Sequence, residues 1–234
     1  MNVRRLQEVE VVDAVGALAV LRTIWHNLPL ELAINVTIVL AALPAAVVAV
    51  TVSPLVAVPV AALCLGPLWM AALAVSLDLL DERAVAYGDF VRAVRQQAGR
   101  GWALAFVPAA VWTAAGGTLI ILANYPSEGW LVVPLSIDGA LVILLGLATL
   151  YTFPLAALTS LRGRRLWVGA LDCVAAVPSI TLSSVLVVIV IGALTAMVGP
   201  GVLVAWPAPL AIYLAAMSRI SADRVATRRG THID

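Results

Sequence analysis

The sequence predicts an all-α fold, a polytopic transmembrane helical bundle of about six spans with both termini in the cytoplasm. Its composition, its long apolar segments and the placement of its arginines predict this class. Hydrophobic residues make up 63% of the 234 residues and charged residues only 12%, whereas soluble domains average about 45–50% and about 25%. A soluble fold could not bury so much apolar surface, so we expect a lipid bilayer around a single membrane domain over residues 1–234.

Six apolar segments approach or exceed the roughly 20 residues that a membrane-crossing helix needs. The tight breaks at Ser53-Pro54 and Gly199-Pro200-Gly201 each separate two of them. The last segment has only about 16 residues and contains Pro207 and Pro209, so a re-entrant segment is the alternative there. The predicted spans are about 32–52, 55–77, 102–122, 131–153, 173–198 and 202–217.

The arginines predict the orientation of these spans. All fourteen basic residues are arginine. If the six segments alternate across the membrane, the loops on one side, 52–55, 123–130 and 199–201, contain none of them. Positively charged loops resist translocation, so the arginine side is predicted to be cytoplasmic. The predicted location is the bacterial cytoplasmic membrane, with the protein crossing it several times and both termini inside.

Two segments on the arginine side have the pattern of amphipathic helices. Residues 13–26 place apolar side chains at helical spacing and predict a helix at the cytoplasmic interface. Residues 78–101 predict the end of the second helix, a break near Gly88, and a short amphipathic helix that begins after Asp89 as its N-cap.

The sequence shows no motif for catalysis, for a cofactor or for a metal. Phosphate-binding loops, H-E-x-x-H, G-x-S-x-G and metal-spaced cysteine or histidine clusters are all missing. A net charge of +1 predicts no nucleic-acid partner. We therefore expect neither an enzyme nor a protein with a cofactor.

Asp138 is the one acid predicted to lie well inside a span. An ionised carboxylate there is costly unless it is paired or reaches water, and no arginine lies on that side. Ser136 or a threonine hydroxyl could bind it, or it could face a water-filled cavity. Asp138 is thus either a proton or substrate site or a structural carboxyl near the outer interface.

One stretch resembles a known family. Leu65-Gly66-Pro67-Leu68-Trp69-Met70-Ala71, followed by Gly88-Asp89-Phe90 and then Arg92 and Arg95, is similar to the YesL-type family of small bacterial integral membrane proteins. The resemblance is clearest over residues 27–100. It implies an accessory role in carbohydrate uptake, because such proteins are often encoded beside carbohydrate ABC transporters. Gly66 and Pro67 would then loosen the second helix, and Asp89 and Phe90 would cap and anchor the cytoplasmic helix.

Two functions follow as hypotheses. The first is a non-catalytic accessory or assembly protein that contacts the permease or ATPase subunits of an ABC transporter through Arg92, Arg95 and Arg100. The alternative is a small transporter or permease subunit that uses Asp138 and its proline-bent helices. Glu82, Ala84 and Gly88 match three places of the Glu-Ala-Ala-x-x-x-Gly loop of ABC permeases, but Arg83 breaks the second place.

Overall fold

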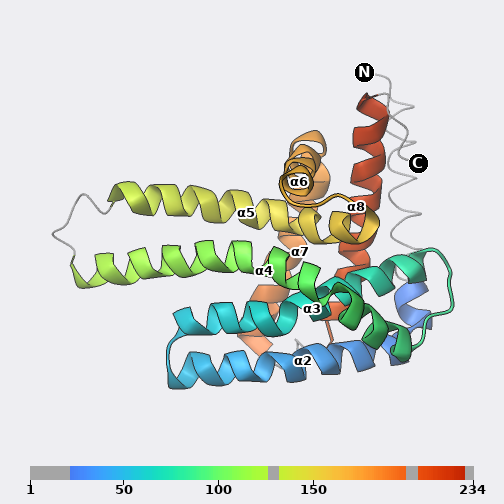
Figure 1. The fold of residues 1–234 in the computed structure, drawn as a ribbon, viewed down its shortest axis with the longest axis horizontal. Coiled ribbons are helices and arrows are strands. Elements are labelled where there is room, and N and C mark those ends of the chain that lie inside the picture. The colour runs from blue at the N-terminus through green and yellow to red at the C-terminus, as the bar shows by residue number, and fades with distance from the viewer. Residues whose placement is uncertain (1–21, 126–131, 199–204, 230–234) are drawn as a thin grey trace.

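The computed structural model describes residues 22–125, 132–198 and 205–229. Over these residues the chain forms helices and no strand, which confirms the predicted all-α class. The predicted interfacial helix 13–26 lies outside the described residues except for 22–26, which are helical. The helices are α2 (Leu28–Thr51), α3 (Pro54–Leu80), α4 (Tyr87–Asn124), α5 (Val132–Leu158), α6 (Arg164–Ala176), α7 (Pro178–Val198) and α8 (Pro207–Arg229) (Figure 1).

Five helices of the described part, α2–α5 and α7, are long and apolar enough to cross a membrane. The chain is therefore a multi-pass membrane protein. α8 is not one of the five, because its second half contains charged residues such as Arg219, Asp223 and Arg224. The predicted sixth span, 202–217, begins in residues outside the described part, and its remainder forms the first half of α8.

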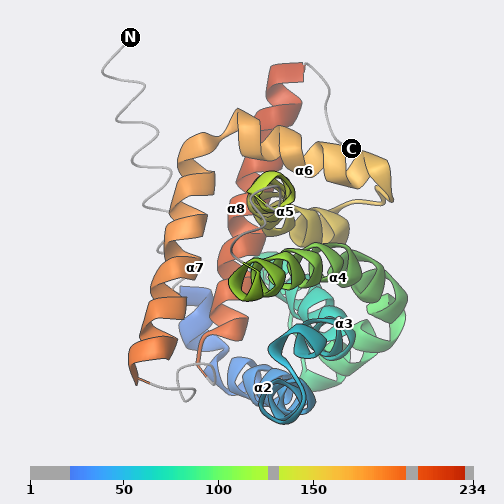
Figure 2. The ribbon, with the colours of Figure 1, turned by 90° about the vertical axis from the view of Figure 1, so that its left-hand side faces the viewer.

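Helices α2 to α5 lie along one direction, whereas α7 and α8 run across them in both views (Figures 1 and 2). The turn at Val52–Ser53, the end of α4 and the start of α5 lie at one end of α2–α5. We call it the arginine-free end because the sequence there, including residues 126–131, contains no arginine. The opposite end, formed by the start of α2, the α3–α4 connection and the end of α5, is the arginine-bearing end. Arg219 of α8 binds Asp81 there, with 2.6 Å between Nη1 and Oδ1.

The predicted cytoplasmic helix and the third span form one helix, α4, of 38 residues. The helix begins at Tyr87 and not after Asp89, so the predicted break near Gly88 is wrong and the real one lies earlier, at Asp81–Ala86. Asp89 accepts a hydrogen bond from the Ala86 amide at 3.0 Å, and this bond caps the helix start from inside its first turn. Glycine alone lowers helix propensity by only about 1 kcal/mol, so Gly88 does not end the helix.

The predicted fifth span, 173–198, is divided in the structure between α6 and α7. Pro178 causes the division, because proline has no amide hydrogen to donate and it disfavours helical geometry at the preceding residue. Val177 accordingly has φ −134° and ψ 67°. The apolar helix therefore starts at Pro178, and Cys173 belongs to the amphipathic helix α6.

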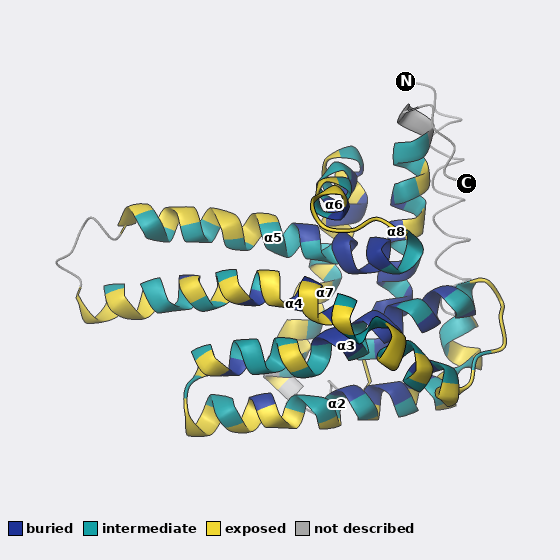
Figure 3. Cartoon of the chain, viewed as in Figure 1, coloured by how far each residue is buried: buried dark blue, intermediate teal, exposed yellow. Residues whose placement is uncertain are grey.

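The buried core lies where α3 meets the end of α5, the middle of α8 and one face of α6 (Figure 3). Met70, Leu73, Ala156, Ala211 and Ala215 are fully buried there. Elsewhere α2, α4, α5 and α7 expose many large apolar side chains, as is expected of surfaces that face lipid. The fold therefore has a tightly packed centre, from which the apolar parts of α2, α4 and α5 extend toward the arginine-free end.

Candidate functional site

The predicted motif residues Gly66 and Pro67 lie on the contact between α3 and α4. A Cβ atom added at Gly66 would lie 2.8 Å from the Gly101 carbonyl oxygen and 2.8 Å from the Ala105 Cβ. One added at Gly101 would lie 2.7 Å from the Gly66 carbonyl oxygen. These two glycines let the two backbones touch, as small residues do at membrane helix contacts. α3 continues through the motif without a break.

Pro67 also explains a hydrogen bond between these helices. Proline has no amide hydrogen, so the carbonyl of Leu63, four residues earlier, has no partner within α3. Trp102 of α4 donates its Nε1–H to this oxygen at 2.8 Å. The indole thereby satisfies the carbonyl that Pro67 frees, as the apolar membrane interior requires.

Asp89 and Phe90 lie at the start of α4, at the arginine-bearing end. Phe90 is only 1% exposed, and its ring lies 5.8 Å from the Tyr87 ring, tilted by 37°. Besides capping α4, Asp89 accepts a hydrogen bond from Arg92 at 2.7 Å. The capped first turn is thus held to the bundle by one buried aromatic side chain.

The three arginines predicted to dock a partner have different surroundings. Arg92 is exposed and pairs with Asp89, one turn before it in the same helix. Arg95 is exposed. Arg100 is partly buried, and its Nη2 donates to the carbonyls of Thr159 and Leu161 at 3.1 and 2.5 Å. Arg100 therefore holds the α5–α6 connection, whereas Arg92 and Arg95 face outward.

Asp138 is the seventh residue of α5, toward the arginine-free end, far along the bundle from Asp89. It is partly buried, and its Oδ2 accepts a hydrogen bond from the Thr118 hydroxyl of α4 at 2.7 Å. A threonine hydroxyl was one of the two partners that the sequence suggested; the other, Ser136, instead donates to the Val132 carbonyl.

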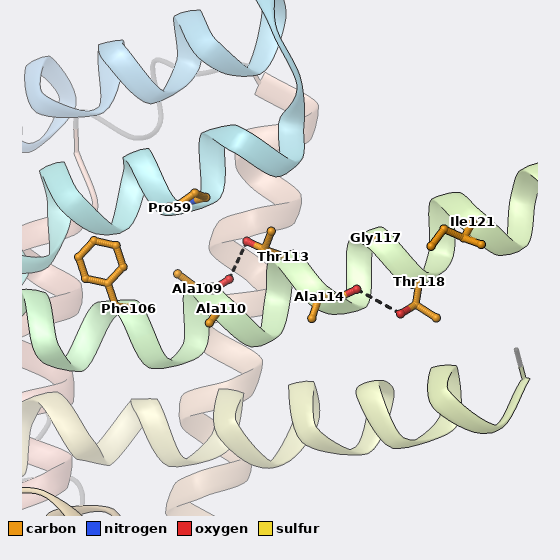
Figure 4. A pocket seen from close by; sticks show the side chains of 9 residues that line it. All are labelled: Pro59, Phe106, Ala109, Ala110, Thr113, Ala114, Gly117, Thr118 and Ile121. Atoms are coloured by element: carbon orange, nitrogen blue, oxygen red, sulfur yellow. Dashed lines mark hydrogen bonds between the residues drawn. The ribbon is translucent and has the colours of Figure 1, made fainter.

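Thr118 also lines a groove of about 570 Å³ between α3 and α4 (Figure 4). Its wall is mostly apolar, with Pro59, Phe106 and Ile121 around the hydroxyls of Thr113 and Thr118. Asp138 is therefore linked to the groove through Thr118.

A second buried carboxyl, Glu31, was missed by the sequence reasoning. It is 2% exposed, and neither carboxyl oxygen has a hydrogen-bond partner among the described residues. One turn later on the same face, the Asn35 Oδ1 accepts the Ala208 amide hydrogen at 2.6 Å, which ties α2 to the start of α8. The available signal was the spacing of four residues between Glu31 and Asn35, which puts both on one helix face.

A cluster of hydroxyl groups where α5, α7 and α8 meet was also missed. The Tyr151 and Thr181 hydroxyls lie 2.9 Å apart, and those of Ser183 and Tyr213 lie 3.2 Å apart. Tyr151 and Thr181 are buried. Single hydroxyls spread over three helices leave no sequence pattern that would group them.

The helices and their exposed apolar faces define the class of the protein: a multi-pass helical membrane protein. Compared with known protein families, with curated proteins and with solved structures, the chain gives no match. Within the described residues, no three histidine, cysteine or acidic side chains come together as a metal site would require.

Proposed function

We propose that this protein is a non-catalytic accessory or assembly component of a bacterial, carbohydrate-type transport system in the cytoplasmic membrane, with its arginine-bearing end inside the cell. The start of α4 is the observation that supports this role most. It would form a rigid docking arm for a permease or ATPase subunit.

α4 is longer than a membrane crossing requires. Its 38 residues correspond to about 57 Å at 1.5 Å per residue, whereas the hydrocarbon core of a bilayer is about 30 Å thick. The apolar run of α4 begins at Trp102. The preceding turns, Tyr87–Gly101, therefore extend past the apolar layer.

These turns of α4 are held rigidly against the rest of the protein. Asp89 caps their first turn, and the buried Phe90 ring fixes them to the core. Arg92 and Arg95 stay exposed on this fixed surface. A preformed surface loses little conformational freedom when a partner binds, which favours docking.

The resemblance to YesL-type proteins supports the transport context. The resemblance rests on two motifs. Gly66-Pro67 lies at the contact between α3 and α4, and Gly88-Asp89-Phe90 lies at the start of α4. The proposal therefore places the partner at the α4 start and not at the α3–α4 contact, which is filled.

Site-specific photocrosslinking in native membranes tests the docking role. A photoreactive residue in place of Arg95 should crosslink to a permease or ATPase subunit identified by mass spectrometry. The same residue in place of Tyr125, which is 62% exposed at the arginine-free end, is the control and should not give that adduct. Adducts to lipid alone from the Arg95 position would contradict the proposal.

A small transporter is the second candidate, because Asp138 is hydrogen-bonded to a threonine that lines a groove. In liposomes with a pH gradient, a transporter would move protons or solute without any partner protein. Asp138→Asn would abolish this transport because it removes the titratable group. Ser136→Ala is the matched control, since Ser136 bonds only its own helix. An accessory protein would move nothing in either form.

A further inference from the structure

A second cavity, of about 720 Å³, lies between α4, the end of α5 and the start of α6. One part of its lining is polar and includes Arg100, Arg162 and Gln97. The other part is apolar and includes Leu104 and Leu166. The cavity therefore offers separate surfaces for a charged group and for a hydrocarbon chain.

The polar part has an uncompensated positive charge. The Arg100 and Arg162 guanidinium groups are close enough to repel each other, and the lining of the cavity contains no carboxylate. Among the described residues neither arginine forms an ion pair. The first turn of α6, which borders the cavity at Gly163, also has no acidic residue. An anion in the cavity would relieve this repulsion.

Arg100 is already held in place for such an anion. Its Nη2 donates to the Thr159 and Leu161 carbonyls, which fixes the plane of the guanidinium group. A guanidinium has five N–H donors, so others remain for the cavity. Planar donors of this kind bind phosphate oxygens with strong charge-assisted bonds.

The position of the cavity decides between a dissolved anion and a lipid. Arg100 lies just before the apolar run of α4, and Leu104 lies one turn inside it. The cavity thus crosses the level at which charged residues give way to apolar ones, where lipid phosphates lie. Trp167, a part-buried member of the lining, has the amphipathic side chain that membrane boundaries favour. A dissolved phosphate would leave the apolar wall uncovered.

We propose that this cavity binds an anionic phospholipid, with its phosphate on Arg100 and Arg162 and an acyl chain along Leu104, Val107 and Leu166. Basic pockets between membrane helices bind lipid headgroups through the same chemistry. The site includes the last turns of the docking arm, at Gln96–Arg100, but not its exposed Arg92 and Arg95. It does not depend on the proposed transport role.

Native mass spectrometry of the full-length protein, titrated with phosphatidylglycerol, tests the site. Arg162→Gln should weaken binding about tenfold, because a charge-assisted contact is lost. Arg162 is exposed, and its side chain forms no hydrogen bond or ion pair with the other described residues, so the variant should fold. Arg95→Gln removes the same charge five residues from Arg100 but outside the cavity, and it should bind as the wild type does.

Two further titrations separate lipid from other ligands. Phosphatidylcholine keeps the phosphate but adds a choline cation next to it. It should therefore bind more weakly than phosphatidylglycerol and lose less affinity in Arg162→Gln. Soluble glycerol phosphate should not displace the bound lipid. Equal affinity of Arg162→Gln and wild type for phosphatidylglycerol would overturn the proposal. Displacement by glycerol phosphate at comparable concentration would also overturn it, in favour of a dissolved phosphate ligand.

Discussion

At the residue scale, Gly66 and Gly101 let α3 and α4 approach to backbone contact. Gly99, two residues before Gly101, has open space around an added Cβ atom. Gly99 and Gly101 have the same intrinsic helix propensity, but only Gly101 has another helix's backbone against it. The contact with Gly66 therefore gives Gly101 a structural importance that its residue type alone does not reveal.

Gly101→Ala should destabilise the protein by about 1–3 kcal/mol, because the new methyl group would meet the backbone of Gly66 and Pro67, which cannot move aside as a side chain can. Gly99→Ala should be neutral or slightly stabilising, since alanine favours a helix over glycine. Thermal unfolding in mild detergent measures both. Equal stability of the two variants would show that the helices separate at no cost.

Glu31 shows how a residue can be overlooked when a span is drawn from hydropathy alone. The predicted first span begins at 32, so this acid fell outside it, although α2 begins at Leu28. Asp138 was singled out because it interrupts an apolar run. Hydropathy finds the depth of a charge within a segment, but burial against another helix depends on packing, which a single sequence does not specify.

Glu31→Met should raise the stability by about 1–3 kcal/mol, because it replaces a buried carboxyl without hydrogen-bond partners among the described residues by an apolar chain of similar length. Asn35→Leu should instead lower it, since the Ala208 amide would lose its acceptor. Denaturant titration in detergent compares the two. A loss of stability in Glu31→Met would mean that the carboxyl makes a contact worth more than its desolvation.

At the element scale, the hydrogen bond from Trp102 to the Leu63 carbonyl links α4 to α3 one turn before Pro67. From the sequence, Pro67 was expected to loosen α3. In the structure, the Trp102 indole of α4 donates to the Leu63 carbonyl that Pro67 leaves without an amide partner. The proline therefore also specifies which face of α4 meets α3. This pairing joins residues 39 apart and could not be read from the proline alone.

Trp102→Phe should cost about 0.6 kcal/mol in the wild-type background, the average measured for hydrogen bonds between membrane helices, and no more than about 1.7 kcal/mol. In a Pro67→Ala background the cost should be smaller, because the alanine amide can donate to the Leu63 carbonyl. A double-mutant cycle of unfolding free energies gives the coupling. A coupling near zero would show that Trp102 contributes by packing only.

The boundaries of elements were predictable where proline marks them. Ser53-Pro54 starts α3 as expected, with the Ser53 hydroxyl accepting the Leu55 amide hydrogen at 3.2 Å. The division at Pro178 was missed, because the apolar pattern continues across it from Cys173. The reverse error occurred at Gly88, where a glycine was given the weight of a helix break.

At the scale of the whole molecule, the ion pair between Asp81 and Arg219 joins the end of α3 to α8. The hydrogen bond from Arg219 lowers the pKa of Asp81 below its ordinary value of 3.8, against a smaller opposing effect of desolvation, and the charges of Arg219 and Arg83 lower it further. A carboxyl whose pKa is lowered on folding stabilises the fold above its ordinary pKa. This contribution disappears as the pH falls through the lowered pKa.

Asp81→Asn should therefore be less stable than the wild type at pH 7, by less than about 1 kcal/mol, since both side chains of the ion pair are exposed to solvent. The difference should shrink as the pH falls below 3.8 and vanish once Asp81 is protonated in the folded protein. Unfolding curves recorded from pH 7 to pH 2 measure this. A difference that persists at the acid end would have to arise from packing and not from the ion pair.

The side of the membrane that each end faces is the remaining prediction for the whole molecule. The ion pair with Asp81 puts Arg219 of α8 at the same end as the α3–α4 connection, although α8 is not one of the five apolar helices of the described part. α7 and α8 lie across α2–α5 (Figure 1), so Arg219 reaches this end without a sixth helix parallel to the others. Hydropathy could not predict that α8 brings the chain back to this end by crossing the other helices.

Cysteine labelling in intact cells tests the orientation, in a background where Cys64 and Cys173 are replaced by alanine. Cysteine in place of Tyr125, exposed at the arginine-free end, should react with a membrane-impermeant maleimide from outside. Cysteine in place of Arg95 or Ala226 should react only after the membrane is opened, because arginine-rich segments resist translocation. Reaction of Arg95→Cys and Ala226→Cys from opposite sides would put the two arginine groups on opposite faces of the membrane and contradict the predicted orientation.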